Sequence, residues 1–262
     1  NECLSLMKNH KPDEIAFLVG DFIDLETSYL IKQLSESLNI KKIECRQEGV
    51  RLPYSDRSQY LFNSTINGIE ESDCILIIGS NVREEAPIIN TRIRKHLLNK
   101  NIPIGLIGEK FDLTFDYEHL GNDLNILKSI SDGENNFCKI LGKAKKPMII
   151  IGQSVLNRDD SLNAYSLIED IVYQYSFLDS SWNGVNTLQL SASRIGALDM
   201  GCYQSSRSLK DIYADAESGS LKLLFSFGAD EIDYSKFQNT KIIYMGSHGD
   251  RGASNADLIL PS

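Results

Sequence analysis

Six short apolar runs, each ending in glycine, limit most strongly what this chain can fold into. They are Ile15 to Gly20, Cys74 to Gly79, Ile104 to Gly108, Met148 to Gly152, Leu223 to Gly228 and Ile242 to Gly246. Uninterrupted runs of Ile, Val, Leu and Phe are typical of strands that are covered on both faces, as in parallel sheets. The sequence therefore predicts an α/β protein with mainly parallel strands.

Helical patterns separate these runs. Leu30, Leu34 and Leu38 recur at four-residue spacing, which predicts a helix with these leucines along one face. Further helices are predicted over 87–98, 124–130 and 161–175. Strand and helix in alternation predict a doubly wound architecture with right-handed crossovers. In such folds ligands bind beside the carboxyl ends of the strands.

The glycines at the strand ends have two interpretations, and both stay open. They could let a ligand approach the backbone, or they could only end strands and form turns. The segment from Gly246 to Gly252 resembles a phosphate-binding loop weakly, with glycine at every third position. His248 and Asp250 could form an acid/base pair there, or they could be ordinary polar loop residues.

Composition and motifs exclude several classes of function. The 262 residues carry 27 basic and 36 acidic side chains, a net charge of -9, which disfavours nucleic acid as a partner. No apolar run is long enough to cross a bilayer, so we expect no membrane insertion. No nucleotide-binding, hydrolase or zinc-protease motif is present, so no catalytic residue is predicted.

The cysteines and histidines do not predict a metal site. The five cysteines are scattered, odd in number and without any Cys-x-x-Cys pair, which is typical of a reducing compartment. Neither a structural zinc nor an iron–sulfur cluster can be built from such spacing, and the four histidines do not supply the missing ligands. We therefore expect no metal bound by this chain alone.

Several sequence segments, in a fixed order, carry a resemblance to a known family. They are residues 60–73, 75–87, 90–94, 112–114, 117–121, 144–147, 197–201, 228–230, 248–250 and 256–261. Together they resemble the large iron–sulfur subunit of respiratory NADH:quinone oxidoreductase (complex I). The matching segment of that subunit is in turn similar to molybdopterin oxidoreductases such as formate dehydrogenase.

The resemblance implies a particular domain organisation. In the formate dehydrogenase and DMSO reductase family, one Rossmann-like α/β lobe is interrupted by a second. By resemblance, residues 1–45 and 202–262 would form the first lobe, and 46–201 would be the inserted lobe. Without the resemblance, two sequential lobes that meet near Lys145 are the simpler interpretation.

The resemblance also points to a cofactor cleft. In the enzymes of the family, strand-end loops hold a pterin guanine dinucleotide, and the resemblance places a vestigial cleft at Gly79, Ser80, Asn81, Gly246, Ser247 and His248. Active members carry a Cys, selenocysteine or Ser ligand for molybdenum near the start of the inserted lobe. Here only Cys45 is near, and it lies too early, so we expect an unreactive thiol.

Three functions remain open. The resemblance favours a cofactor-less scaffold in the peripheral arm of complex I, whose iron–sulfur clusters would be bound in an amino-terminal region that this segment lacks. The parent complex would pass electrons from NADH to quinone at the cytoplasmic face of a bacterial inner membrane or the mitochondrial matrix side. The alternatives are an active molybdopterin oxidoreductase fragment and a nucleotide- or anion-binding module.

The scaffold hypothesis requires a docking surface for other peripheral-arm subunits. The basic run Arg92, Arg94, Lys95 and His96 is one candidate. It could equally be a solvated helix end.

Overall fold

The computed structural model describes residues 2–261 and divides the chain into two compact units. Unit 1 comprises Asn1–Val50 and Ser191–Ser262, and unit 2 comprises Arg51–Leu190. Residues 46–50 and 191–201, which the prediction assigned to the inserted lobe, belong to unit 1 in this division. Whether the two units fold as separate domains stays a prediction.

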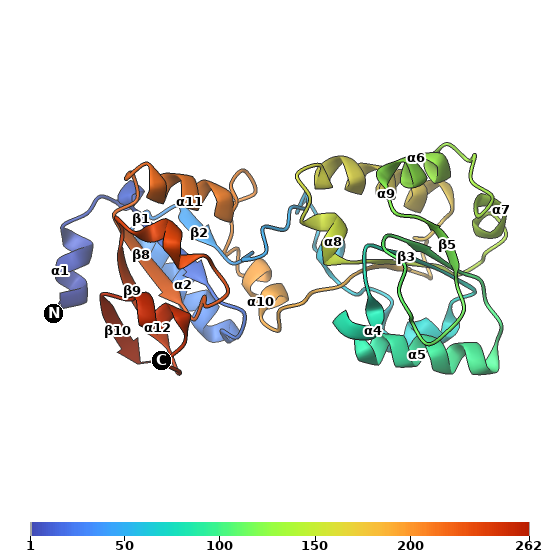
Figure 1. The fold of residues 1–262 in the computed structure, drawn as a ribbon, viewed down its shortest axis with the longest axis horizontal. Helices are drawn as coiled ribbons and strands as arrows, with labels where there is room; N and C mark the ends of the chain where they lie inside the picture. The colour runs from blue at the N-terminus through green and yellow to red at the C-terminus, as the bar shows by residue number, and fades with distance from the viewer. Residues whose placement is uncertain (1, 262) are drawn as a thin grey trace. The chain divides into compact units, whose positions relative to one another are not determined.

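Unit 1 is built on a five-stranded sheet in which every pair is parallel (Figure 1). The strand order is β10-β9-β8-β1-β2. The strands are β1 (Ile15–Val19), β2 (Lys42–Glu44), β8 (Leu223–Phe227), β9 (Lys241–Gly246) and β10 (Leu258–Pro261). The helices are α1 (Glu2–Lys8), α2 (Leu25–Ser37), α10 (Arg194–Asp199), α11 (Leu209–Glu217) and α12 (Arg251–Asn255), with 3-10 turns η1 (Pro12–Glu14) and η4 (Tyr234–Phe237).

The sheet of unit 1 is covered on both faces. On one face, Ala16, Leu18 and Leu224 pack in a buried cluster with residues of α11 and η4. Neighbouring residues in a strand point to opposite faces, so Phe17 lies on the other side, edge to face with Phe225 at 5.1 Å between ring centroids. The helix α2 belongs to this second face. Strands that are apolar on both faces need such double cover, which explains their uninterrupted hydrophobic sequence.

Unit 2 repeats the same architecture, with the all-parallel order β5-β4-β3-β6-β7. The strands are β3 (Cys74–Ile78), β4 (Ile104–Ile107), β5 (Glu118–Gly121), β6 (Pro147–Ile151) and β7 (Val185–Thr187). The helices are α3 (Thr65–Gly68), α4 (Val82–Glu85), α5 (Pro87–Asn99), α6 (Leu124–Ser131), α7 (Cys138–Leu141), α8 (Gln153–Leu156) and α9 (Ser161–Gln174), with 3-10 turns η2 (Arg57–Tyr60) and η3 (Ile69–Glu71). In Figure 1, α5 lies on one face of the sheet and α6 and α9 lie on the other.

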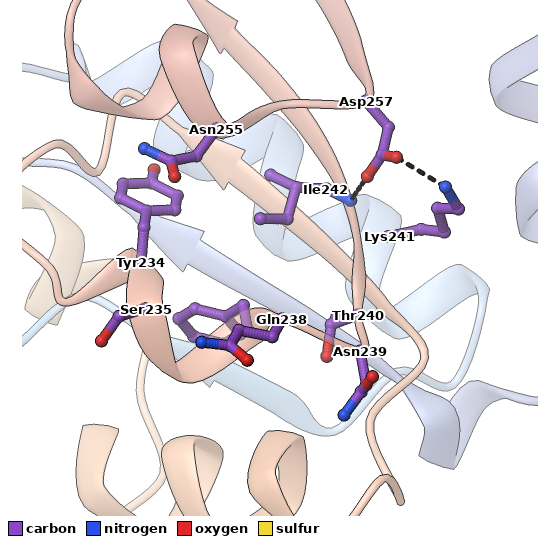
Figure 2. A pocket seen from close by; sticks show the side chains of 10 residues that line it. Tyr234, Ser235, Gln238, Asn239, Thr240, Lys241, Ile242, Asn255 and Asp257 are labelled. Carbon is purple, nitrogen blue, oxygen red and sulfur yellow. Dashed lines mark hydrogen bonds and ion pairs between the residues drawn. The ribbon is translucent and has the colours of Figure 1, made fainter.

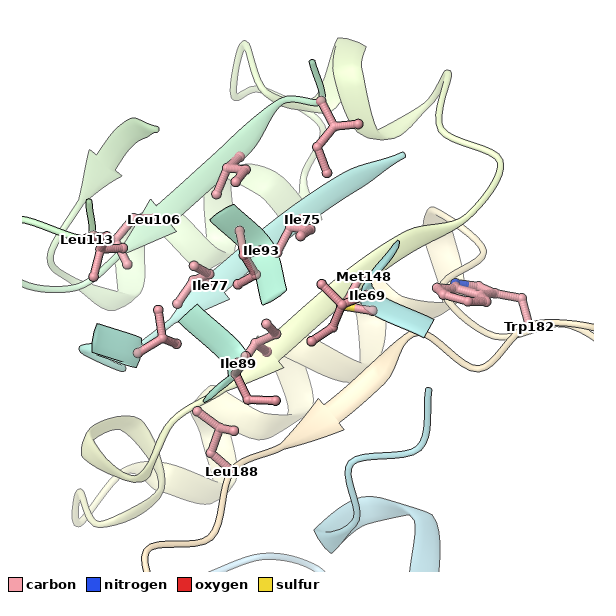
Figure 3. Packing of buried hydrophobic residues seen from close by; sticks show 14 residues of the cluster. Ile69, Ile75, Ile77, Ile89, Ile93, Leu106, Leu113, Met148, Trp182 and Leu188 are labelled. Atoms are coloured by element: carbon pink, nitrogen blue, oxygen red, sulfur yellow. The ribbon is translucent and has the colours of Figure 1, made fainter. Parts of the chain in front are cut away.

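The core on the α5 side of unit 2 is made of branched aliphatic side chains (Figure 3). Ile75 and Ile77 of β3 point into it, and Ile89 and Ile93 of α5 meet them from the helix. Trp182 closes one end of the cluster, where its indole N–H donates to the carbonyl of Pro147 at 2.7 Å. Trp182 is the single tryptophan of the sequence, so its fluorescence reports on unit 2.

Shortening Ile93 by one methylene should weaken unit 2 measurably. Ile93 is fully buried, and Ile→Val in such positions typically costs about 0.5–1.5 kcal/mol. We expect Ile93→Val to lower the denaturant midpoint of the Trp182 fluorescence transition. Ile88→Val is the matched control, because Ile88 lies on the same helix and is 65% exposed. Equal midpoints for the two variants would contradict this packing.

The predicted α/β fold, doubly wound with parallel sheets, is confirmed. The six glycine-ended runs are the central strands of the two sheets, and the four predicted helices are α2, α5, α6 and α9. Four strands were not predicted, namely β2, β5, β7 and β10, and each lies at the edge of a sheet. They are only three or four residues long, and β2, β5 and β7 carry polar residues, so they give little periodic signal.

The helix α2 forms as predicted, but its leucine stripe is exposed. An amphipathic helix normally turns such a stripe toward the core. Here Ser28, Ile31 and Ser35 are the buried residues of α2, whereas Leu30 is 64% exposed and Leu34 is 38% exposed.

Candidate functional site

Both sheets reverse their strand order at a point where two glycines meet. In unit 1, β2 follows β1 toward one edge of the sheet, whereas β9 and β10 follow β8 toward the other edge. The strand order therefore reverses between β1 and β8. There the N–H of Gly20 donates to the carbonyl of Phe227 at 2.8 Å. A Cβ on Gly20 would overlap the carbonyl of Gly228. This edge is where open α/β sheets bind ligands.

Unit 2 has the equivalent arrangement between β3 and β6. The N–H of Gly152 donates to the carbonyl of Ile78 at 2.8 Å, and a Cβ on Gly152 would overlap the carbonyl of Gly79. Gly79 and Gly228 occupy equivalent places and both have a left-handed φ, +63° and +58°. Glycine is therefore needed at both reversal points for backbone contact, whether or not a ligand binds.

Three of the predicted cleft residues, Gly246, Ser247 and His248, lie beside a cavity of about 760 Å³ in unit 1. The cavity opens at the carboxyl ends of β8 and β9 and is bounded by the first half of α2. Its apolar lining includes Phe22, Leu30, Ile31, Leu34, Phe227 and Met245. Of the two interpretations of His248 and Asp250, the structure favours ordinary polar loop residues, since His248 Nδ1 lies 2.8 Å from Ser247 Oγ.

The charge around this cavity is acidic. Asp24, Asp230 and Asp250 line it, and no Lys or Arg does among the described lining residues. Tyr244 Oη donates to Asp230 at 2.9 Å, and burial together with this carboxylate raises the pKa of Tyr244. The Thr27 N–H holds the pKa of Asp24 below its usual value, so this carboxylate stays ionised. The cavity therefore repels anions.

The other three predicted residues, Gly79, Ser80 and Asn81, follow β3 in unit 2. The hydroxyl of Ser80 donates to Glu85 at 2.7 Å, and the N–H of Asn81 donates to the same carboxylate at 3.2 Å. Beside Gly79 the cavity measures only about 70 Å³. The two triplets of predicted residues belong to different units, so a single cleft formed by all six stays a prediction.

The linings of the two edges can be compared with what a pterin guanine dinucleotide requires. The pyrophosphate of such a cofactor needs cationic groups or free N–H donors, whereas the cavity of unit 1 presents three carboxylates. The cavity beside Gly79 measures about 70 Å³, whereas ligand sites usually occupy about 300–1,000 Å³. Among residues 2–261, no group of three or more His, Cys, Asp or Glu side chains is arranged to hold a metal ion.

Cys45, the nearest candidate for a molybdenum ligand, is buried at the end of β2. Burial, with Glu44 adjoining, raises its pKa far above that of an ordinary thiol. Burial also raises the pKa of Cys74 to about 12 and that of Cys202 to about 11. Because the thiolate is the nucleophile and metal ligand, these sites disfavour reactivity.

Thiol titration should therefore separate the cysteines into two classes. Cys3 and Cys138 are partly exposed, whereas Cys45, Cys74 and Cys202 are buried. We expect two of the five thiols to react rapidly with Ellman's reagent at pH 8, and the other three only after denaturation. Rapid modification of Cys45 in the folded chain, located by peptide mapping, would contradict this.

Two other surface features offer no comparable site. Within the basic run, Arg92 and Lys95 pair with Glu70 at 2.8 and 2.9 Å, and His96 is buried against the carbonyl of Ser72. A second cavity of about 550 Å³ lies at the amino end of β9 (Figure 2). Its lysine, Lys241, is paired with Asp257 at 2.6 Å, and this is the edge opposite to the one where α/β sheets bind ligands.

Sequence reasoning missed the apolar part of the unit 1 cavity. Phe22 is 89% exposed and lies in the loop between Gly20 and α2. Its position two residues after the strand-end glycine Gly20 was the available signal, because such loops line the ligand edge. The exposure of Leu30 and Leu34 had no sequence signal, since the same spacing is typical of a core-facing helix.

The two all-parallel sheets define a class, the doubly wound α/β proteins. Comparison with known families gives the particular one: a model of the molybdopterin oxidoreductase family matches residues 1–262, and the chain belongs to that family. Among the residues that the structure describes, no helix is both long and apolar enough to cross a membrane.

Curated relatives confirm the resemblance to the large complex I subunit. The chain is 36% identical over 256 residues to the NADH-quinone oxidoreductase G subunit of Rickettsia felis, which is 98% of this chain and 37% of that protein. It is 38% identical over 273 residues to the NADH-ubiquinone oxidoreductase 75 kDa subunit of Reclinomonas americana, covering 39% of it. It is 33% identical over 258 residues to the mitochondrial NADH dehydrogenase [ubiquinone] iron-sulfur protein 1 of Solanum tuberosum, covering 34% of it.

The chain thus spans somewhat more than a third of the length of these relatives. They come from bacteria and from mitochondria.

Proposed function

We propose that this chain is a cofactor-less scaffold of the molybdopterin oxidoreductase family, acting in the peripheral arm of an NADH:quinone oxidoreductase. The complex would pass electrons from NADH to quinone, and its clusters would be held outside this segment. Its place would be the cytoplasmic face of a bacterial inner membrane or the matrix side in mitochondria. One observation carries the proposal: the ligand edge of unit 1 bears Asp24, Asp230 and Asp250 with no lining Lys or Arg among the described residues.

Electrostatics and family membership support this proposal together. The chain keeps the fold of the family, with its two parallel sheets. The acidic ligand edge of unit 1 would repel the anionic cofactor for which the family is named. The buried Cys45 thiol supports it as well, because a ligand of molybdenum must be available as a thiolate. The curated relatives are named as parts of NADH–quinone oxidoreductases.

A pull-down tests the scaffold role. The tagged chain is mixed with the other peripheral-arm subunits of the same organism, produced separately. We expect at least one of them to be retained stoichiometrically after a wash at about 0.15 M salt, where surface charge alone is screened within about 8 Å. A heat-unfolded sample of the chain is the control. Failure of every subunit to bind would contradict the proposal.

Guanine nucleotide should not stabilise the chain. A ligand that binds only the folded state raises its stability by RT ln(1 + [L]/Kd), so even a Kd of about 10 µM would give about 2.7 kcal/mol at 1 mM. We expect GDP at millimolar concentration to leave the thermal midpoint unchanged, because the acidic cavity repels phosphate. Phosphate-free buffer and added NaCl of equal ionic strength serve as controls. A rise of several degrees would favour the nucleotide-binding alternative.

A further inference from the structure

The most unusual surface of the described residues is an apolar patch around the cavity of unit 1. We define the α2 groove by Phe22, Leu30, Leu34, Phe227 and Met245, with Asp24, Asp230 and Asp250 at its rim. Phe22 is 89% exposed and Leu30 is 64% exposed. Large apolar side chains gathered at a surface depression, rimmed by polar groups, mark an interaction site more often than scattered ones do.

The orientation of α2 is what makes this groove. The helix begins after Asp24, whose side chain accepts the Thr27 N–H at 2.6 Å. Its buried residues are Ser28, Ile31 and Ser35. Leu30 and Leu34 lie outside this buried set, so they line the groove and are exposed to solvent. Leucines placed this way gain burial only when something docks on them.

The rim determines what can dock. Asp250 is exposed and precedes α12 without capping it, so its carboxylate is available to a partner. Asp24 and Asp230 add negative charge to the lining, in which the described residues include no Lys or Arg. An apolar floor with an acidic rim complements a helix that has leucines on one face and lysines or arginines beside them.

We propose that the α2 groove docks a basic amphipathic helix of another protein. This inference rests on the proposed scaffold function, for which it names the docking surface and the chemistry of the partner. The helix would place its apolar face on Phe22, Leu30 and Leu34, and its cations would lie against Asp250 and the other rim carboxylates. A cavity of about 760 Å³ accepts two or three large side chains as anchors.

A designed peptide pair tests the chemistry. The probe is a fluorescein-labelled helix of about 18 residues, with leucines at i, i+3, i+4 and i+7 and lysines elsewhere. Its partner peptide carries glutamate in place of every lysine. By fluorescence anisotropy we expect the lysine peptide to bind the 262-residue chain at least about tenfold more tightly than the glutamate peptide. Equal affinities, or no binding of either peptide, would overturn the proposal.

Matched variants separate the groove from general attraction to an acidic protein. Phe22→Ser/Leu30→Ser removes two exposed anchors, and Tyr173→Ser/Leu98→Ser removes two side chains of unit 2 that are 91% and 80% exposed. We expect the first pair to weaken the lysine peptide about tenfold or more and the second to leave it unchanged. Asp250→Asn should weaken it a few-fold, and Asp170→Asn, an exposed acid of unit 2, should not.

Assembly provides a readout that distinguishes the two proposals. If the wild-type chain retains a peripheral-arm subunit and Phe22→Ser/Leu30→Ser loses it, both proposals are supported. If both chains retain the same set, the groove proposal is wrong and the scaffold function stands. The oligomeric state of the chain is measured by analytical ultracentrifugation. If the wild-type chain is a dimer and the Phe22→Ser/Leu30→Ser variant is a monomer, a second copy of the chain fills the groove. That result would overturn the proposed partner.

Discussion

Gly20→Ala should destabilise unit 1 by about 3 kcal/mol or more, because the new methyl group would overlap the backbone of Gly228. Neither partner is a flexible side chain, so the ends of β1 and β8 must separate. Their hydrogen bond from Gly20 to Phe227 would be strained with them. The measurement is denaturant unfolding followed by far-UV circular dichroism, with Trp182 fluorescence as a second probe.

Gly249→Ala is the matched control for this change. A Cβ at Gly249 meets no atom within 4 Å, and this residue lies in the same unit. We expect its denaturant midpoint to equal that of the wild type. In Gly20→Ala part of the circular dichroism transition should move while the Trp182 transition keeps its midpoint, whereas in Gly152→Ala the Trp182 transition itself should move. A wild-type midpoint for Gly20→Ala would contradict the close contact at the reversal point.

Arg46→Met should lower the free energy of unfolding by about 3–5 kcal/mol, because it leaves the buried carboxylate of Glu44 without its partner. Arg46 and Glu44 are each 2% exposed, and the guanidinium binds both carboxylate oxygens at 2.6–2.7 Å. It also donates to the carbonyls of Gln204 and Arg207, so it ties the loop after β2 to the segment before α11. Unfolding followed by circular dichroism should show the loss.

The loss should depend on pH in a defined direction. Burial raises the pKa of Glu44 despite the arginine, and removing the arginine raises it further. A carboxyl whose pKa is higher in the folded state binds more protons there, so stability falls as pH rises through the folded pKa. We expect the Arg46→Met deficit to be smaller at pH 5 than at pH 8.

Two further variants are controls for Arg46→Met. Arg46→Met/Glu44→Gln, which removes the stranded charge and keeps the acceptor for the backbone N–H groups, should recover part of the loss. Arg158→Met, which breaks a pair that is 47% and 39% exposed, should leave the midpoint unchanged. A pH-independent deficit, or one no larger than that of Arg158→Met, would contradict the buried pair.

The central part of the fold could be predicted from the sequence, because burial on two faces leaves a direct signal. β1, β3 and β6 are uninterrupted apolar runs, β8 is apolar apart from Ser226, and the glycines that follow these strands lie where the sheets reverse. The edge strands could not be predicted. β7, for example, is three residues long, and its Asn186 is buried through hydrogen bonds to Ser64 and Gly184, which no periodicity reveals.

For the candidate site, the sequence indicated a place in the fold, and whether a ligand binds there stays a prediction. Gly246 to His248 do border a cavity, because the carboxyl ends of parallel strands share one edge. Its acidic and apolar character depends on Phe22, Asp24 and Asp230, which come from loops far apart in the sequence. Their gathering is a result of the strand order, with β8 beside β1, and that order follows from no local pattern.

The molybdenum and pterin content of the assembled protein decides whether this chain is a scaffold without a cofactor. The chain, tagged within its full-length parent protein, is purified from its own cells together with the subunits that accompany it. Metal is measured by mass spectrometry and pterin by fluorescence after oxidation. We expect the chain to co-purify with the iron–sulfur subunits and to carry neither molybdenum nor pterin. One molybdenum atom and its pterin per chain would contradict it.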